Sequence, residues 1–359
     1  MRKFLFLILF QVPIIIFGQL PTNDKNWNST PILYDEFTGT RYWNNNRVDN
    51  TYKWIAYFSE SGIKHDSTDI YCNHYYEHQI YQRENAIFST SSPGYMILRA
   101  DYKPNTTNYW YPGPPYSPVT CPYDYISGAI ESIQSFKYGY FEIKCALPNK
   151  NYGNFPAFWL WSGINRYNEI DIFEHTIHGE ANEERRFTGT YYTSNKVAVQ
   201  KVNYFVPSNE PGLTSFHTYA IEWSPKVIIW YFDGKQVGQA INEPEITDQP
   251  MKLKVNYALN DYITLADTNL FPLEMKIDYV KVYNLKCDCN SIVSITNSAD
   301  LNNFNYSVKK KITIGYAGST IKVQGGSVSL RATDEIIING DFEVPIGSEF
   351  FAFTHSCPQ

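Results

Sequence analysis

The sequence predicts an all-β protein, an antiparallel β-sandwich followed by a small C-terminal β module. Three observations lead to this fold class. Apolar residues rarely recur with the period of an amphipathic helix, whereas short strand-like runs are frequent. Turn-forming pairs such as Pro148–Asn149 and Asp233–Gly234 separate these runs. Many strands without helices between them favour antiparallel sheets packed face to face.

The N-terminus has the pattern of a secretory signal peptide. Arg2 and Lys3 precede the apolar run FLFLILFQVPIIIF, and Gly18 offers a cleavage point. This run is shorter than the roughly 20 residues that a membrane-spanning helix needs. We therefore predict a signal peptide over residues 1–18 and a secreted or cell-surface protein without a membrane span.

The segments with strand character lie between the signal peptide and residue 285. They cover residues 95–102, 138–148, 155–161, 187–194, 216–224, 227–237 and 275–285. Within one of them, Asp233–Gly234 suits the type I′ turn of a β-hairpin. Two Tyr-rich stretches, 71–85 and 108–125, read as long loops that either line a sugar-binding cleft or cover an edge strand.

Charge and composition limit the class of partner. The net charge is −6, and loss of Arg2 and Lys3 with the signal peptide would make it about −8, so nucleic acid is not an expected partner. Aromatic residues make up 17% of the chain, including 30 Tyr and 8 Trp. Such residues stack well on sugars, although a large β-sheet core also favours them.

The segment YNEIDIFEH, residues 167–175, places three carboxylates within six positions. On a helix, at about 100° per residue, Glu169, Asp171 and Glu174 would be scattered around the axis. On a regular strand, Glu169 and Asp171 share a face, but Glu174 has the opposite parity.

A β-bulge would resolve this conflict of parity. Two apolar residues, Ile172 and Phe173, separate Asp171 from Glu174 where strict alternation allows only one. A bulge inserts one residue and brings Glu174 to the same face as Glu169. Carboxyl groups about 5–5.5 Å apart are typical of retaining glycosidases. A solvated acidic strand or a cation site are the alternatives from the motif alone.

Several segments together resemble the glycoside hydrolases of family sixteen, which include laminarinases, lichenases, agarases and carrageenases. The matching segments are residues 33–39, 127–148, 155–161, 168–175, 222–237 and 275–284. The resemblance implies a concanavalin-like β-jelly roll with a concave substrate cleft and a retaining, double-displacement mechanism. The spacing Glu-x-Asp-x-x-Glu is similar to the family's bulged branch of laminarinases and marine galactanases.

The resemblance also implies roles for single residues. Glu169 matches the nucleophile, Asp171 the assisting acid and Glu174 the general acid/base. Trp159 matches an aromatic residue of the cleft floor, and Trp161 has the same parity on its strand.

The same resemblance implies no cofactor for catalysis, although the Gly94 carbonyl and Asp278 match a structural calcium site. Oxygen ligands of this kind suit Ca²⁺. We expect a monomer that binds a polysaccharide.

The substrate is harder to read than the chemistry. Laminarinases usually have a His in the strand after the acid/base, where this sequence has Tyr192. The first expectation is internal cleavage of β-1,3-glucan of the laminarin type. A marine galactan cleaved by an agarase, porphyranase or carrageenase type of enzyme is the alternative. A non-catalytic carbohydrate-binding protein is a second one, against which the intact Glu169 and Glu174 argue.

The composition changes after Leu285, where the chain becomes rich in Asn and Ser. We therefore predict a catalytic domain over residues 19–285 and a small β-rich module over residues 286–359. The module resembles cell-surface or secretion modules, with carbohydrate binding as the alternative. A disulfide from Cys287 or Cys289 to Cys357 would close it.

Overall fold

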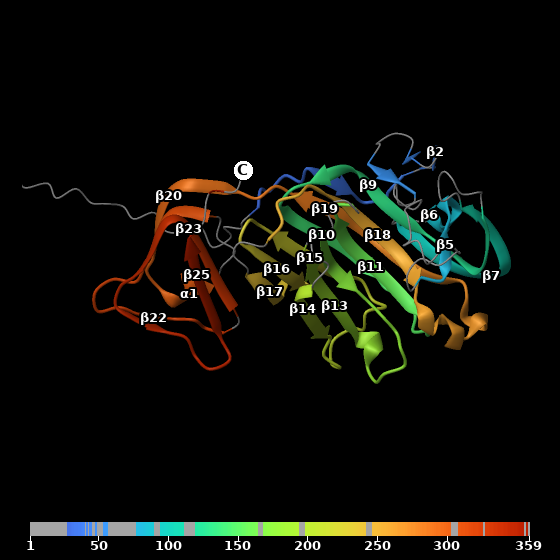
Figure 1. Ribbon diagram of the computed structural model, residues 1–359. Helices are drawn as coiled ribbons and strands as arrows, with labels where there is room; N and C mark the ends of the chain where they lie inside the picture. Colours follow the sequence, from blue (N-terminus) through green and yellow to red (C-terminus); the bar gives the residue numbers. More distant parts are fainter. Residues whose placement is uncertain are drawn as a thin grey trace, which may run out of the picture. The chain divides into compact units, whose positions relative to one another are not determined.

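The computed structural model describes residues 27–39, 41, 43–44, 47–48, 53–56, 77–89, 94–110, 119–163, 168–193, 198–241, 246–302, 308–325, 327–354 and 357. The described chain divides into two compact units, Trp27–Leu285 and the residues from Lys286 onward (Figure 1). The predicted signal peptide, residues 1–18, lies outside the described residues. In the described chain, no helix has both the length and the apolarity that crossing a membrane requires.

The first unit contains two large sheets whose neighbouring strands run antiparallel in all but one pair. The ten-stranded sheet consists of β1 (Leu33–Asp35), β5 (Gln79–Tyr81), β6 (Ala86–Phe88), β7 (Met96–Trp110), β8 (Val119–Ser127), β10 (Gly139–Ala146), β15 (His217–Trp223), β16 (Val227–Phe232), β17 (Lys235–Ile241) and β19 (Leu273–Tyr283). Its order is β17-β16-β15-β10-β19-β7-β8-β5, with β1 beside β19 and β6 beside β7, and β5 and β8 form the parallel pair.

The nine-stranded sheet carries the predicted acidic strand. It consists of β2 (Trp43–Asn44), β3 (Arg47–Val48), β4 (Trp54–Ile55), β9 (Ala129–Phe136), β11 (Asn154–Trp161), β12 (Glu169–Glu174), β13 (Arg186–Tyr192), β14 (Ala198–Phe205) and β18 (Met251–Leu259). The order is β14-β13-β12-β11-β18-β9-β4-β3-β2. Short 3₁₀ helices lie between strands: η1 (Arg83–Asn85), η3 (Glu183–Arg185), η4 (Asp261–Leu265) and η5 (Thr268–Leu270).

One hydrophobic core joins the two sheets. Alternate residues of the strands point into it, among them Phe141 and Ile143 of β10 and Phe158 and Leu160 of β11. The intervening residues of the nine-stranded sheet therefore face outward. This arrangement confirms the predicted all-β sandwich.

The predicted hairpin turn is also confirmed. The two residues Asp233 and Gly234 connect β16 to β17 and have φ angles of 45° and 73°. Positive φ at both positions is what a type I′ turn requires, and Gly234 adopts it without steric cost.

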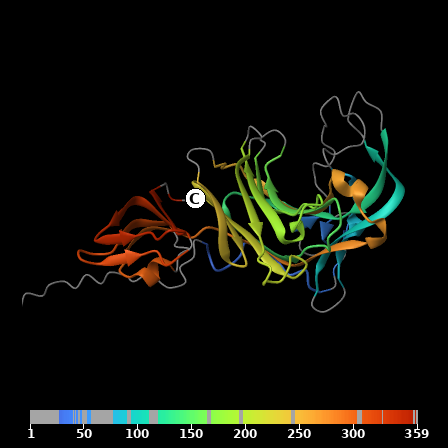
Figure 2. The same ribbon diagram turned by 90° about the horizontal axis from the view of Figure 1, so that it is seen from below.

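The interpretation of residues 108–125 as a loop is wrong for the described part of that segment. β7 and β8 form a long antiparallel hairpin that extends beyond the rest of the sandwich (Figure 2). Pro104 of β7 is tolerated because it lies where the register shifts, next to Asn105 with φ 61°. In the other predicted loop, 71–85, β5 and η1 are regular structure, and residues 71–76 lie outside the described chain.

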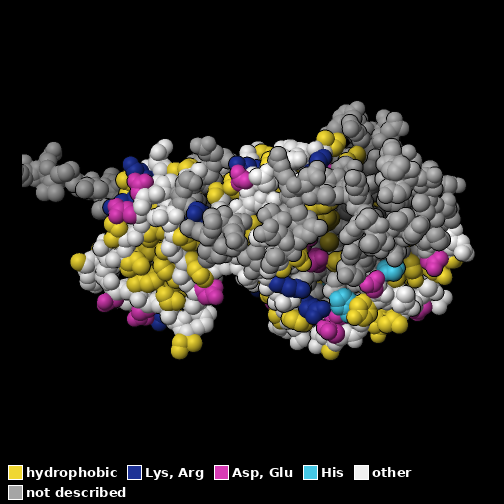
Figure 3. All heavy atoms as spheres, viewed as in Figure 1, with side chains coloured by type: hydrophobic (Ala, Val, Ile, Leu, Met, Phe, Trp, Pro, Cys, Tyr) yellow, Lys and Arg dark blue, Asp and Glu magenta, His cyan; other side chains and the backbone are white. Residues whose placement is uncertain are grey.

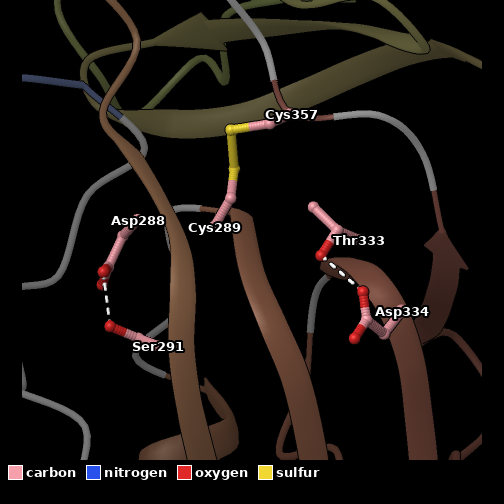
Figure 4. Close-up of a disulfide and its surroundings, with 6 residues drawn as sticks. All are labelled: Asp288, Cys289, Ser291, Thr333, Asp334 and Cys357. Carbon is pink, nitrogen blue, oxygen red and sulfur yellow. Dashed lines mark hydrogen bonds between the residues drawn. A yellow bond between two sulfur atoms is a disulfide. The ribbon is translucent and has the colours of Figure 1, made fainter.

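The second unit has parallel strands. β20 (Cys287–Ile295), β21 (Val308–Ile314), β23 (Ser327–Ile338) and β25 (Glu349–Thr354) form one parallel sheet in that order, and β22 (Thr320–Lys322) pairs with β24 (Asp341–Glu343). One short helix, α1 (Ser298–Asn302), precedes β21. Of the two pairings left open by the sequence, the structure contains Cys289–Cys357 (Figure 4). Apolar side chains gather on the visible face of this unit (Figure 3).

Candidate active site

The structure contains the β-bulge that the spacing of the carboxylates predicts. Against β11, Phe173 pairs with Phe158 and Asp171 pairs with Trp159, which leaves Ile172 as the extra residue of β12. The pairing with β13 shifts in register over the same stretch, between Asp171 and Glu174. Because of this additional residue, the side chains that follow it on β12 point to the opposite face from the one that strict alternation would give them.

The bulge brings all three carboxylates to one face of the nine-stranded sheet, here called the carboxylate face. Glu169, Asp171 and Glu174 pair in turn with Trp161, Trp159 and Ala157 of β11 and with Tyr192, Thr190 and Thr188 of β13. Each set of partners follows the two-residue period of a strand, so its members share a face. The opposite face of β12 carries Ile170 and Phe173, which are fully buried in the core.

A tryptophan of the other sheet holds the bulge in place. The Trp230 indole Nε1 donates a hydrogen bond of 2.8 Å to the backbone carbonyl of Asp171. This approach requires glycine at position 189, because a Cβ there would lie 2.4 Å from the same indole nitrogen. The unpaired backbone group that a bulge creates thus has a buried partner.

Burial raises the pKa values of two acids on the carboxylate face. Burial raises the pKa of Asp171 well above its usual value, and the nearby carboxylates of Glu174 and Glu169 raise it further. Burial also raises the pKa of Glu174 to about 7, against the opposing effects of Lys201 and a hydrogen bond with Thr188. A carboxyl group with such a pKa exchanges its proton readily near neutral pH.

Tyr192 lies beside the first carboxylate. It is the cross-strand partner of Glu169, and burial together with Asp171, Glu174 and Glu169 raises its pKa to about 12. The phenol therefore stays protonated and can donate a hydrogen bond toward a bound ligand.

The two predicted aromatic residues lie together on the carboxylate face. The rings of Trp159 and Trp161 are 5.9 Å apart between centroids and tilted by 36°. Both side chains are partly exposed. The Trp159 Nε1 donates a 2.8 Å hydrogen bond to the side-chain oxygen of Asn256, which fixes the orientation of its ring.

Sequence reasoning missed a buried ion pair beside these two rings. The Lys254 ammonium lies 3.0 Å from the Glu131 carboxylate, and both side chains are almost fully buried. The same ammonium lies 4.4 Å from the centroid of the Trp161 ring, within the range of a cation–π contact. The available signals were Glu131 within an apolar strand and two lysines, 252 and 254, on one face of β18.

A hydrogen-bonded chain continues from Trp159 to β5. Asn256 Nδ2 donates to the Tyr81 hydroxyl at 2.8 Å, and that hydroxyl donates to the Glu77 carboxylate at 3.0 Å. Burial is the main cause of the raised pKa of Tyr81, with Glu77 as the second cause. The chain connects the carboxylate face to the end of the molecule that bears the β7–β8 hairpin.

Three further polar residues near the acids, His175, Arg185 and Arg186, have structural partners. His175 is buried, its Nδ1 lies 2.8 Å from the Arg186 carbonyl, and burial lowers its pKa to about 4. Arg185 donates to the carbonyl of Val206, and Arg186 pairs with the buried Glu183 at 3.1 Å. These arginines are therefore committed to the turn around η3.

Of the two predicted calcium ligands, Gly94 and Asp278, the second has a partner on the neighbouring strand. The Asp278 carboxylate forms an ion pair of 2.8 Å with the Lys144 ammonium. The described residues contain no cluster of three carboxylate, His or Cys side chains that could hold a metal ion. An ion at Asp278 would compete with the Lys144 ammonium, and the calcium site at Gly94 and Asp278 stays a prediction.

Comparisons with known proteins agree on one family. The sequence model described as glycosyl hydrolases family 16 matches residues 72–281, more than half of the chain. Endo-1,3-1,4-beta-glycanase EglC of Rhizobium meliloti (strain 1021) is 33% identical over 170 residues, which cover 46% of this chain and 35% of the relative. The kappa-carrageenase of Pseudoalteromonas carrageenovora is 26% identical over 231 residues, 56% of this chain and 57% of the relative.

Among solved structures, the laminarinase catalytic domain from Thermotoga maritima MSB8 has the same fold. The TM-score is 0.54 at 23% identity, and the match covers 73% of this chain and 100% of that chain. The matched parts of the two curated relatives are 35% and 57% of their lengths, so the likeness spans less than two thirds of either relative.

Proposed function

Because this chain belongs to the glycosyl hydrolases of family 16, we propose that it is a retaining endo-glycoside hydrolase of a β-linked polysaccharide. The observation that carries this proposal is the bulge in β12, which places Glu169, Asp171 and Glu174 on one face. That face also presents the Trp159 and Trp161 rings, which can stack on sugars.

Each carboxyl group has its own role in the proposed mechanism. Glu174, with a pKa of about 7, donates its proton to the glycosidic oxygen while the Glu169 carboxylate attacks the anomeric carbon. The bond to the leaving sugar breaks as a covalent glycosyl–Glu169 ester forms. Glu174 then takes a proton from water, which attacks the ester and releases Glu169. Burial raises the pKa of Asp171, which favours its protonated form, and a protonated Asp171 donates a hydrogen bond to the carboxylate beside it.

The dimensions of β12 are compatible with retention. Glu169 and Glu174 pair with residues four positions apart on β11, so their Cα atoms are about 13 Å apart. Glutamate side chains that lean toward each other shorten the gap between their carboxyl groups. The separation of about 5–5.5 Å that retaining enzymes need is within their reach.

β-1,3-Glucan of the laminarin type is the proposed substrate. The relatives and neighbours named for β-glycanase and laminarinase activity support it. A marine galactan is the second candidate, because a kappa-carrageenase is also a relative and Tyr192 stands where laminarinases usually have His. A non-catalytic carbohydrate-binding protein is the third, but such a protein has no use for an acid with the pKa of Glu174.

The remaining parts of the proposal concern the protein outside the carboxylate face. Residues 1–18 direct export, residues 19–285 form the catalytic domain, and residues 286–359 serve at the cell surface or in secretion. Carbohydrate binding is the alternative role for the last segment. The protein acts as a monomer and its catalysis needs no cofactor.

A panel digestion tests the substrate and the reaction type together. The chain is incubated with laminarin, lichenan, agarose, porphyran and kappa-carrageenan, and the oligosaccharides released are profiled. We expect internal cleavage of laminarin, with products that NMR first detects in the β configuration. Cleavage of a galactan with none of laminarin would replace the substrate, and an α-configured first product would contradict retention.

A further inference from the structure

A pocket of about 530 Å3 lies at the end of the first unit that bears the β7–β8 hairpin. The hairpin supplies one wall, and the segment from Ile263 to Thr268, after β18, supplies another. Its volume is within the range of about 300–1,000 Å3 that is common for small-ligand sites. None of the residues assigned above to catalysis or sugar stacking lines it.

Three tyrosines from the hairpin face this pocket. Tyr102 of β7 is the cross-strand partner of Tyr125 of β8, and their ring centroids are 5.2 Å apart. Tyr123 follows the two-residue period of β8 and lines the same pocket. Tyr125 is buried against Phe271, whereas Tyr102 is 38% exposed. Tyr125 therefore fixes the position of the two rings, and Tyr102 is accessible to a ligand.

The polar groups of the lining favour a neutral, hydroxylated ligand. Thr264 and Thr268 contribute hydroxyls, and the His78 ring lies 2.6 Å from the Asp261 carboxylate at the rim. Asp124 adds a carboxylate, and the described lining residues include no lysine or arginine. A sulfated sugar would meet only negative charge from Asp124, whereas the hydroxyls of a neutral sugar can donate to it.

The pocket is joined to the carboxylate face by short structural steps. The backbone N–H of His78 donates to the Leu259 carbonyl at the end of β18. Three residues earlier on the same strand, Asn256 holds Trp159 and binds Tyr81. Asn256 pairs with Ala157, which is itself the partner of Glu174, so the pocket lies on the Glu174 side of the row of acids.

We propose that this pocket is a distal subsite that binds a neutral sugar unit of the polysaccharide whose scissile bond lies at Glu169 and Glu174. This inference rests on the proposed function. Stacking of a pyranose on the Tyr102 and Tyr123 rings provides the apolar contact, and the two threonines and Asp124 bind its hydroxyls. A long chain can reach this subsite and the acids together, whereas a short oligosaccharide bound at the acids cannot.

The test compares a polymer with a short substrate in Tyr102→Ala and Tyr123→Ala variants. We expect kcat/KM on laminarin to fall roughly 3- to 10-fold, the effect of losing one aromatic contact, while kcat/KM on laminaritetraose stays within about twofold. Tyr34→Ala is the matched control, because Tyr34 is also 38% exposed and lies on β1, away from the pocket. Thermal melting of each variant checks that the fold is intact.

Two outcomes would overturn the subsite. One is an unchanged kcat/KM on laminarin, and the other is an equal fall on both substrates. If the panel identifies another polysaccharide, that polymer and its tetrasaccharide replace the laminarin pair. If no polysaccharide is cleaved, the proposed function fails, but affinity electrophoresis of the full chain in polysaccharide gels still decides. Retardation that Tyr102→Ala leaves unchanged rejects the subsite.

Discussion

Two groups of charged side chains lie on the carboxylate face, and their charges are arranged in opposite ways. On β12, Glu169, Asp171 and Glu174 gather three acids in one row. Two strands away on β18, Lys254 forms a buried pair of opposite sign with Glu131 of β9, whose carboxylate also lies 3.4 Å from the partly exposed Lys252 ammonium. In the first group burial and like charge raise pKa values, whereas in the second each charge compensates the other. We therefore assign the chemistry to the three acids, whose charges have the same sign, and the orientation of the tryptophans to the pair of opposite charges.

The largest expected effect is on catalysis. Glu174→Gln and Glu169→Gln each remove one reacting group, and kcat should fall by about 10³-fold or more for either variant. The measurement is reducing-end release from the polysaccharide that the panel identifies. A Glu174→Gln enzyme with near-normal turnover would contradict the role assigned to that residue.

Glu174→Gln should also stabilise the fold at neutral pH. The pKa of Glu174 rises from its usual 4.5 to about 7 in the folded chain, so the folded state holds this proton more tightly than the unfolded state. Stability contributed by this group is therefore lost as pH rises from about 4.5 to 7. Urea unfolding at several pH values should show this loss in the wild type and not in Glu174→Gln.

The next prediction concerns the pair of opposite charges. Glu131→Gln leaves the Lys254 ammonium buried without its counter-charge, which should lower the free energy of unfolding by about 3–5 kcal/mol. The double variant Glu131→Leu with Lys254→Met removes both buried charges and leaves only the partly exposed Lys252 without its carboxylate partner, so it should lose much less stability than Glu131→Gln. Urea midpoints measure both. A single variant as stable as the double one would show that the pair is not a balanced unit.

The acids could be predicted from the sequence because their evidence is local. The spacing of Glu169, Asp171 and Glu174, with the two apolar residues between the last two, requires a bulge if all three share a face. The Glu131–Lys254 pair could not be predicted, because its members are far apart in sequence and meet only through the order β11-β18-β9. The pattern of apolar residues within one segment does not show which strands will be neighbours in the sheet.

The β7–β8 hairpin and the C-terminal unit show two further features that composition alone does not predict. Residues 108–125 are rich in Pro and aromatic residues, so they are expected to form a loop, yet Pro122 pairs with Thr107 within the β7–β8 hairpin. The strand-like pieces after Leu285 indicated β structure but not its direction. The strands β20, β21, β23 and β25 pair in parallel. The alternation of apolar and polar residues within a short segment does not specify the direction of the neighbouring strand.

Another prediction disturbs the bulge without changing a carboxylate. Gly189→Ala places a methyl group against the Trp230 indole, and we expect a loss of about 1–3 kcal/mol in stability. It should also lower kcat, because the displaced indole no longer binds the Asp171 carbonyl. Gly128→Ala is the control, since its Cβ would lie 2.3 Å from the Asn85 carbonyl, away from the acids. Equal losses of kcat in both variants would exclude a specific role for Trp230.

The smallest expected effect is a shift in the pKa of Glu174 when one exposed charge near the three acids is removed. Lys201 of β14 lowers the pKa values of both Glu174 and Asp171, and its side chain is exposed. In Lys201→Met the pKa of Glu174 should rise, so the alkaline limb of the pH profile of kcat/KM should move to higher pH by a fraction of a unit. Because salt screens an exposed charge, the shift should shrink at high ionic strength. Lys235→Met, on β17, removes another exposed lysine and should leave the limb in place. A shift of the limb to lower pH would mean that Glu174 is not the group whose protonation limits the reaction.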